Sequence, residues 1–600
     1  MKQKNYQNST KNTLGKLPIW NLKDLYESPK AMKLNNDLNK LRISTKKFEK
    51  KYASKITKIS SNQLLKAIIE LEDIDTKIDK IMSYAHLLVA EDGNNEKNKI
   101  FYQQMQEQIT NIASSIVFFS LEINEISEKN LKKIYADKKL KIYKNWIKNI
   151  RKFKPYQLDV KTEKLLQEKS ITSRSAWIRL FDDTIASLKF PFKGKNLSSA
   201  EIFNFLSDKN ESKRKKSAEV VSAVLKDNIS LFTSITNNLA KDKSINDKWR
   251  GLPNPVSSRN LSNVVEDEVV EALTETIKEN YPKIAHRYYK IKSNWLKKKS
   301  LMYWDRNAPL PFQSQSIYSW KDARQIVTDA YSNFDKRAGN IVNKFFDNSW
   351  IHAPVIPGKS PGAFAASTVP SAHPFILVNY QGKARDIATL AHELGHGIHQ
   401  YLSGRKQTYF NSSTPLTLAE TASVFGEMLT FKSLLSITTK ENERKGLLAN
   451  KVEDMLNTVV RQSACVEFEK RIHHKRKIKE LSVDEICEIW IDVQKKSLGP
   501  SIKFNDDYKY FWSYIPHFIH SPFYVYAYAF GDCLVNSLFN VYESKLPKFE
   551  DKYITLLESG GSDTYDKLLK PFGLNPKKKD FWQKGVNVIE NLIDQLEEQN

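Results

Sequence analysis

Hydrophobic residues recur at three- and four-residue steps along most of the chain. The pattern holds over residues 60–139, where Leu64, Ile68 and Leu71 fall on one face, as in an amphipathic helix. It resumes after an interruption at Pro155, and again from Ser199 onward. No run of alternating hydrophobic and polar positions, typical of strands, appears before the middle of the chain. We therefore expect a mainly α-helical protein.

One segment departs from this pattern. Residues 350–380 hold several of the prolines and glycines and end in the β-branched and aromatic run Phe375–Tyr380. That run lies between Pro374 and Gly382 and predicts a short strand ahead of the next helix. The strand could be an exposed edge, to which a peptide adds by main-chain hydrogen bonds, or a core strand of a small sheet. The sequence does not decide between these two alternatives.

The helix expected after this strand carries the chain's most specific motif. Asp386 is a plausible N-cap and Gly404 a plausible stop. His392 and His396 are four residues apart, so both imidazoles project from one helical face, as two ligands of one ion must. Glu393 follows the first histidine and can act as general base on a water molecule. The motif predicts a catalytic zinc site.

A catalytic zinc ion takes three protein ligands and keeps one open position. One class of zinc enzymes supplies a third histidine ten residues after the first, but Leu402 stands there. The other source is a carboxylate on a following helix, and Thr414-Pro415 opens such a helix with Pro at its first position. We predict Glu420 as the third ligand. Glu427, two turns further on, is predicted to orient a ligand histidine.

Charge and composition add little to this picture. The 600 residues carry a formal net charge of +25, which could suggest an anionic partner such as nucleic acid or a membrane surface. The lysines, however, are spread along the chain beside acids, and no nucleic-acid motif accompanies them. We interpret the densest basic run, residues 473–479, as surface. Neither nucleic acid nor membrane is an expected partner.

Length and local composition suggest more than one packed region. Six hundred residues exceed what one hydrophobic core usually serves, and Pro, Gly and Lys cluster at 191–197. We expect a flexible tail at 1–15, a helical N-terminal domain at 16–195 and a catalytic domain at 196–600. Three scattered cysteines and the lack of an apolar leader or a membrane-length apolar run favour the cytoplasm.

The motif at 391–396, followed by Ala419-Glu420-Thr421-Ala422-Ser423, resembles the thimet oligopeptidase family of zinc metallopeptidases, family M3, and specifically its oligoendopeptidase F branch. Segments 20–26, 362–364 and 379–382 are similar to that branch as well. The resemblance implies a large helical zincin-type fold, with a small β-sheet beside the active-site helix and a helical N-terminal region covering the cleft. It also implies one Zn²⁺ per chain, and a substrate-binding role for Gly362 and Ala363.

The His- and Tyr-rich segment from His517 to Tyr528 also resembles this branch. The resemblance implies that its His and Tyr residues bind substrate and stabilise the oxyanion that forms when water attacks an amide. We favour Tyr528 with His517 for catalysis, and include Tyr526 beside them. His520 and Tyr524 are expected to bind substrate. The alternative reading, an aromatic face packed in the core, stays open.

These observations lead to two hypotheses. The first is a zinc-dependent endopeptidase that hydrolyses short oligopeptides, acting as a monomer or small homo-oligomer. The alternative is a catalytically inactive peptide-binding protein of the same fold.

Overall fold

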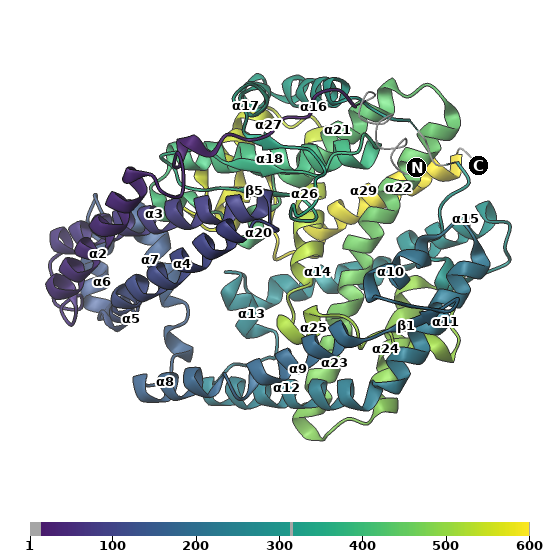
Figure 1. Ribbon diagram of the computed structural model, residues 1–600, viewed down its shortest axis with the longest axis horizontal. Helices are drawn as coiled ribbons and strands as arrows, with labels where there is room; N and C mark the ends of the chain where they lie inside the picture. Colours follow the sequence, from purple (N-terminus) through teal and green to yellow (C-terminus); the bar gives the residue numbers. More distant parts are fainter. Residues whose placement is uncertain (1–13, 313–315, 599–600) are drawn as a thin grey trace. The chain divides into compact units, whose positions relative to one another are not determined.

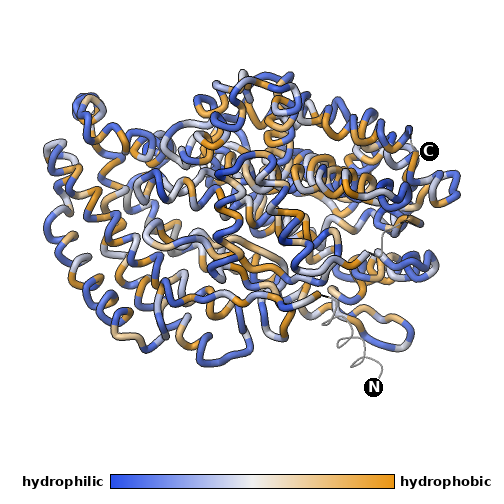
Figure 2. Tube along the Cα trace, turned by 90° about the horizontal axis from the view of Figure 1, so that it is seen from above, coloured by the Kyte–Doolittle hydropathy of each residue, from blue (hydrophilic) through white to orange (hydrophobic). Residues whose placement is uncertain are grey.

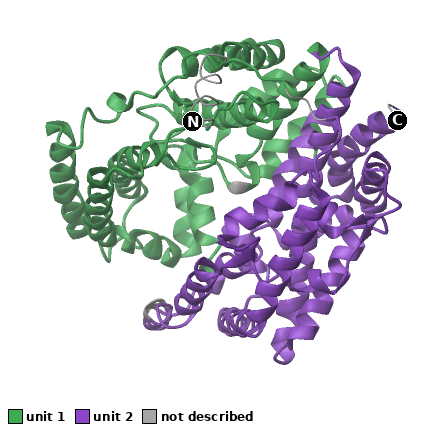
Figure 3. Cartoon of the chain, turned by 45° about the vertical axis from the view of Figure 1, so that its right-hand side comes forward, with its two compact units in different colours: residues 1–154, 315–437, 541–574 green, residues 155–314, 438–540, 575–600 purple. Residues whose placement is uncertain are grey.

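The computed structural model describes residues 14–312 and 316–598 of the chain. Apart from its last two positions, the predicted flexible tail at 1–15 lies outside these residues. The chain divides into two compact units, each built from three separate stretches (Figure 3). Unit 1 comprises residues 1–154, 315–437 and 541–574, and unit 2 comprises 155–314, 438–540 and 575–600. The sequence-based division at 195/196 falls inside unit 2, in a short hairpin.

Unit 1 is built mainly from helices (Figure 1). Its α-helices are α2 (Met32–Tyr52), α3 (Ser61–Glu91), α4 (Glu96–Ala113), α5 (Phe118–Glu125), α6 (Glu128–Ala136), α7 (Lys144–Arg151), α16 (Trp320–Phe334), α17 (Lys336–Asp347), α18 (Ala384–Lys406), α19 (Tyr409–Ser412), α20 (Leu416–Ala419), α21 (Ser423–Ile437), α27 (Phe549–Ser559) and α28 (Tyr565–Leu569).

The expected amphipathic helices at 60–139 are confirmed as α3 to α6. On α3 the side chains of Leu64, Ile68 and Leu71 are buried, as their spacing predicts. The helix starts at a capping box. The Ser60 side chain accepts a hydrogen bond from the backbone N–H of Gln63, and the Gln63 side chain accepts one from the backbone N–H of Ser60. Hydrophobic and hydrophilic residues are interspersed along the helices of the described residues (Figure 2).

A three-stranded sheet lies in unit 1 with the order β4-β6-β5. The strand β6 (Phe375–Leu377) is central and fully buried, parallel to β4 (Ile351–His352) and antiparallel to β5 (Phe364–Ala366). The predicted strand therefore exists, and of its two alternatives the core strand is correct. The edge alternative is wrong because β6 is paired on both sides, and β5 is an edge strand of this sheet.

The helix α18 packs against β5, β6, α17, α21 and α27 of unit 1. Its predicted ends were misplaced. Asp386 is not the N-cap. It lies three residues after the N-cap Lys383, and its side chain accepts a 3.0 Å hydrogen bond from the backbone N–H of Lys383. Gly404 does not stop the helix, which continues to Lys406. The buried face of α18 includes Leu390, Ala391 and Leu394, which explains why this helix lies in the core of the unit.

Two glycines let α18 and its neighbours approach closely. A Cβ atom on Gly395 would lie 2.3 Å from the carbonyl oxygen of Ala422, directly before α21. A Cβ atom on Gly426 would lie 1.7 Å from the hydroxyl oxygen of Tyr331 on α16. That buried hydroxyl donates a 2.8 Å hydrogen bond to the carbonyl oxygen of Ala391. Both separations are far below van der Waals contact, so a side chain at either position would force the backbone at Ala422 or the ring of Tyr331 to move.

Unit 2 is also mainly helical. Its α-helices are α8 (Val160–Lys169), α9 (Arg174–Ser187), α10 (Ser199–Asn204), α11 (Glu211–Asp227), α12 (Ile229–Arg250), α13 (Ser257–Ser262), α14 (Asp267–Asn280), α15 (Arg287–Trp295), α22 (Glu441–Thr458), α23 (Val460–Ile478), α24 (Val483–Leu498), α25 (His517–His520), most of α26 (Tyr526–Glu543) and α29 (Lys579–Glu598). Its strands are β1 (Phe190–Phe192), β2 (Lys195–Leu197), β3 (Leu301–Met302) and β7 (Ile502–Lys503).

The sequence suggested that the basic run at 473–479 lies on the surface. The run lies at the end of α23, and it is only partly exposed. The His473 side chain is buried against the ring of Phe523, at 4.9 Å between centroids, so only the rest of the run is available to solvent. Cys465, Cys487 and Cys533 are buried and free. Among the described residues, no helix combines the length and the apolar character needed to cross a membrane.

We expect Gly426→Ala to lower the free energy of unfolding by at least about 2 kcal/mol, because the methyl group overlaps Tyr331 and displaces its hydrogen bond to Ala391. Gly404→Ala is the matched control, since a Cβ there meets Pro370 at an ordinary 3.6 Å within helix α18. That control should keep or slightly raise stability, as alanine favours helix. Thermal unfolding measures both. Equal melting temperatures for the two variants would contradict the close approach.

Candidate metal centre

His392 and His396 project from one face of α18, one turn apart, as predicted. Their rings meet edge to face, with centroids 4.8 Å apart. The two Nε2 atoms lie 3.2 Å from each other. Neither side chain is fully buried, because about a quarter of the His392 side chain and a fifth of the His396 side chain remain exposed. The pair is thus held by the helix but open on one side.

Glu420 reaches the histidines from a break between two helices, not from a helix. The short α20 ends at Ala419, Glu420 is its C-cap, and α21 begins only at Ser423. The prediction of one helix that starts at Pro415 and carries both glutamates is therefore wrong: Pro415 is the N-cap of α20, and only Glu427 lies within α21. The break nonetheless brings the Glu420 carboxylate to both rings.

The three side chains have a geometry that suits one metal ion. Glu420 Oε2 lies 3.5 Å from His392 Nε2 and 3.4 Å from His396 Nε2. Ligand atoms about 2.0–2.1 Å from a tetrahedral ion are separated by roughly 3.4 Å from one another, so all three observed spacings fit. Two imidazole nitrogens and one carboxylate oxygen are also a donor set that zinc accepts. These residues form the metal-compatible cluster among the described His, Cys, Asp and Glu residues.

Two further side chains orient the cluster. Glu427 Oε1 lies 2.5 Å from His392 Nδ1, as predicted for a carboxylate that holds a ligand histidine. A proton on Nδ1, donated to Glu427, leaves the Nε2 lone pair facing the cluster. Ser423 Oγ donates a 2.7 Å hydrogen bond to Glu420 Oε2, a contact that the sequence reasoning missed. The three-residue spacing from Glu420 to Ser423, at the start of a helix, is the signal that could have revealed it.

Burial and opposite charges set the protonation of these groups in the metal-free protein. For His392, burial alone would lower the pKa, but the hydrogen bond and charge of Glu427 raise it to about 9. For Glu420, burial alone would raise the pKa, but the two histidines lower it to about 2. Burial raises the pKa of Glu393, which is 6% exposed and adjoins the histidines. An acid of this kind is suited to take and return a proton near neutral pH.

A cavity of about 490 Å³ lies in unit 1 beside the cluster. His396 and residues further along α18 form one wall, including His399 and Gln400. The loop after β5 and the side chains of Asp75 and Asp79 on α3 form others. This volume is large enough for several side chains of a ligand. The centre therefore opens on one side to a space that a substrate can occupy.

Gly362 and Ala363 lie immediately before the edge strand β5. Gly362 has a positive φ of 83°, and its carbonyl oxygen accepts a 2.8 Å hydrogen bond from the side-chain amide of Asn379. The carbonyl oxygen of Ala365 accepts a bond from Gln400 on α18 at 3.3 Å. The strand and the residues before it are thus fixed against the helix that carries the metal ligand candidates.

The predicted His and Tyr residues of the C-terminal half lie in unit 2. The structure brings His517, Tyr524 and Tyr528 together: His517 Nε2 is 3.4 Å from the Tyr528 hydroxyl, and its ring is stacked with that of Tyr524. His520 Nε2 lies 2.7 Å from an Asp182 carboxylate oxygen. Tyr526 has a different partner: its buried hydroxyl accepts a 2.7 Å hydrogen bond from Asn263.

Comparison with known proteins assigns the chain to a family. Residues 204–588 match the family model for peptidase family M3, and residues 122–190 match the model for oligopeptidase F. Oligopeptidase PepF of Bacillus subtilis is 25% identical over 96% of this chain and 87% of its own length. An oligoendopeptidase F homolog of Borreliella burgdorferi is 27% identical over 93% of this chain and 94% of its own length.

Solved structures agree at the level of the fold. A structure from Chlamydophila abortus has a TM-score of 0.87 at 22% identity, covering 97% of this chain and 98% of its own. The oligoendopeptidase F of Enterococcus faecium has a TM-score of 0.70 at 20% identity, covering 94% and 98%. The His-Glu-x-x-His helix contributes two of the three residues of the metal-compatible cluster, and with the match to a peptidase family this site defines a metalloendopeptidase. The family match over most of the chain is more specific, and the chain belongs to peptidase family M3.

We expect a divalent metal ion to release about one proton when it binds the metal-free protein at pH 7. The pKa of His392 is raised to about 9 in the free site, so this ring is protonated at pH 7 and must lose its proton to become a ligand. Titration calorimetry in buffers of different ionisation enthalpy measures the release. In Glu427→Gln the pKa of His392 should fall, and the release with it. Binding without proton release at pH 7 in the unmodified chain would contradict this assignment.

Proposed function

We propose that this chain hydrolyses short oligopeptides with one Zn²⁺ ion, held by His392, His396 and Glu420. The observation that carries the proposal is the meeting of three ligand atoms at tetrahedral spacing, with Glu393 adjoining them. Zinc supplies a Lewis acid that polarises the scissile carbonyl and makes water more acidic. The oligopeptidase names of the relatives support short peptides as the substrates.

The side chains of this chain handle the protons and the orientation. Glu393 takes a proton from the attacking water and passes it to the leaving amine. Its raised pKa lets it do both. Glu427 holds the ring of His392 in one tautomer, and Ser423 holds the carboxylate of Glu420. Both contacts fix the ligand set before substrate binds.

We further propose that the backbone at Gly362 and Ala363, with the edge strand β5, binds the peptide main chain by strand addition. In unit 2, Tyr528 with His517 donates hydrogen bonds to the developing oxyanion, while Tyr524 and His520 bind substrate. Tyr528, which is 40% exposed, suits this role better than Tyr526, whose hydroxyl is buried against Asn263. Location in the cytoplasm, a monomeric or small homo-oligomeric state and the domain limits 16–195 and 196–600 stay predictions.

We expect Glu393→Gln to lower kcat for an unstructured, internally quenched peptide by about 10³-fold while about one zinc ion per chain is retained. Glu420→Gln is the contrasting variant, which should lose both activity and metal because a ligand is removed. Metal analysis and steady-state kinetics separate the two. Full activity in Glu393→Gln, or cleavage that resists a chelator, would refute the mechanism. Zinc binding without hydrolysis across a broad peptide library would favour the inactive peptide-binding alternative.

We expect Tyr528→Phe to reduce kcat about 10²-fold with unchanged metal content and melting temperature, because the hydroxyl proposed to bind the oxyanion is lost from a side chain that is 40% exposed. Tyr526→Phe is the matched variant. It should lower the melting temperature, since it leaves the buried Asn263 amide without its acceptor, but change kcat less than about threefold. The opposite pattern, with kcat lost in Tyr526→Phe and kept in Tyr528→Phe, would exchange the two roles.

A further inference from the structure

The segment that carries His517 and Tyr528 turns sharply between α25 and α26. His517 lies before this turn and Tyr528 after it, so the conformation of the turn sets the 3.4 Å separation of the two side chains. We call residues 521–525 the aromatic turn. The positions of the proposed oxyanion-binding groups depend on how it is held.

Phe523, at the centre of the aromatic turn, has a left-handed backbone. Its φ is 61°, a region that glycine adopts freely but that bulky residues rarely enter, at a cost of roughly 1 kcal/mol or more. Its side chain is fully buried and packs against His473 of α23. Such a conformation persists only where the surrounding structure imposes it. The turn must therefore be fixed by its contacts.

The backbone contact at this residue comes from a buried acid. The N–H of Phe523 donates a 2.8 Å hydrogen bond to Glu469 Oε1 on α23. Glu469 is only 3% exposed, and its second oxygen, Oε2, has no hydrogen-bond partner among the described residues. A buried carboxyl group with an unpaired oxygen is costly for the fold.

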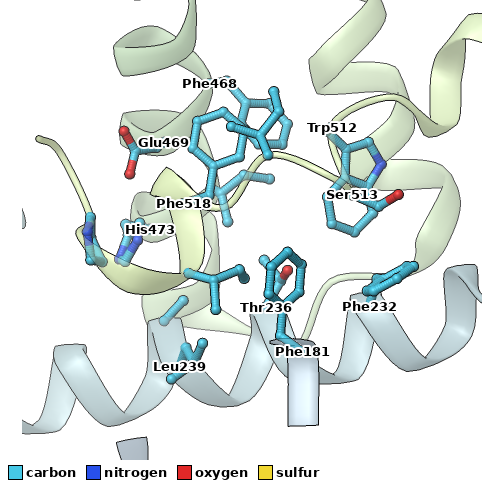
Figure 4. Close-up of a pocket in the computed structure, with 15 residues that line it drawn as sticks. Phe181, Phe232, Thr236, Leu239, Phe468, Glu469, His473, Trp512, Ser513 and Phe518 are labelled. Atoms are coloured by element: carbon cyan, nitrogen blue, oxygen red, sulfur yellow. The ribbon is translucent and has the colours of Figure 1, made fainter. Parts of the chain in front are cut away.

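The surroundings of Glu469 leave room for the turn to shift. A cavity of about 30 Å³ beside this contact is lined by residues of α23 and of the segment, including Glu469, His473, Phe518, Ile519 and Pro522. Figure 4 shows Glu469 and His473 on the same side of this pocket, whose other labelled residues are mostly aromatic. Because Phe518 and Ile519 belong to α25, movement into the cavity would displace the adjacent His517.

We propose that Glu469 is a positioning residue: by accepting the N–H of Phe523 it holds the aromatic turn in its left-handed form and so sets the alignment of His517 with Tyr528. This inference rests on the proposed function, because it assigns a consequence in catalysis to a group that touches neither metal nor substrate. Arg259 supports the same turn from α13, where its Nε donates to the carbonyl oxygen of Pro522 at 3.3 Å.

Two variants of similar volume isolate the hydrogen bond. Glu469→Gln keeps an acceptor for Phe523, whereas Glu469→Met fills the space without a good acceptor, and both remove the ionisable group. We expect Glu469→Met to lower kcat ten- to hundredfold with KM changed less than about threefold and zinc content unchanged. Glu469→Gln should restore kcat to within about threefold of the unmodified chain. Glu467 lies on α23, as Glu469 does, and Glu467→Ala breaks a surface ion pair with Lys278 of α14; this variant is the control and should be neutral.

Hydrogen exchange of residues 517–528, resolved to single amides, is the second measurement. The Phe523 amide should be strongly protected in the unmodified chain and in Glu469→Gln, and should exchange at least tenfold faster in Glu469→Met. If Glu469→Met does not fold, an unprotected Phe523 amide in the unmodified chain still overturns the proposal. Equal kcat in the Gln and Met variants, or loss of activity in both, also overturns it. Failure of the unmodified chain to cleave any peptide would instead refute the proposed function, while hydrogen exchange would still decide the role of Glu469.

Discussion

The close approach of α18 and the start of α21 is the constraint on which the rest of the site depends. Gly395 meets the backbone at Ala422, and this contact leaves no space for a side chain. The two backbones lie near each other, so the side chains after α20 reach the site. Glu420 contacts both histidines, Glu427 contacts His392, and Ser423 contacts Glu420. A separation larger by the width of a methyl group would place the carboxylate beyond the reach of both rings. The metal geometry is therefore a result of helix packing.

The same crossing concentrates charge in a partly buried place. Glu393, Glu420 and Glu427 lie around two histidines, so without a metal ion the carboxylates outnumber the cations even when both rings are protonated. The pKa values of Glu420 and Glu393 shift in opposite directions, because the rings stabilise the anion of Glu420 whereas burial disfavours the charge of Glu393. A bound divalent cation relieves the repulsion. The site is thus organised for a metal ion before one binds.

Much of the metal centre could be read from the sequence because helical spacing is a local property. The four-residue interval of His392 and His396 fixes their common face, whatever the helix packs against. Glu420 lies close to both histidines, as predicted. A continuous helix was expected to bring it there, but it is the break after α20 that does so. Burial of β6 and the left-handed turn at Phe523 depend on residues distant in the sequence or on backbone geometry. No local pattern encodes them.

The division of unit 1 into three stretches affects the order in which its parts are synthesised and can fold. The helix α18 packs against α27, and Gln407 beyond its end donates a 2.9 Å hydrogen bond to the carbonyl oxygen of Glu558. About 150 residues of chain separate these partners, and most of them belong to unit 2. During synthesis, the catalytic helix therefore leaves the ribosome long before its last supporting helix exists. The contacts that α27 makes with α18 and Gln407 can therefore form only after about 150 further residues have been translated.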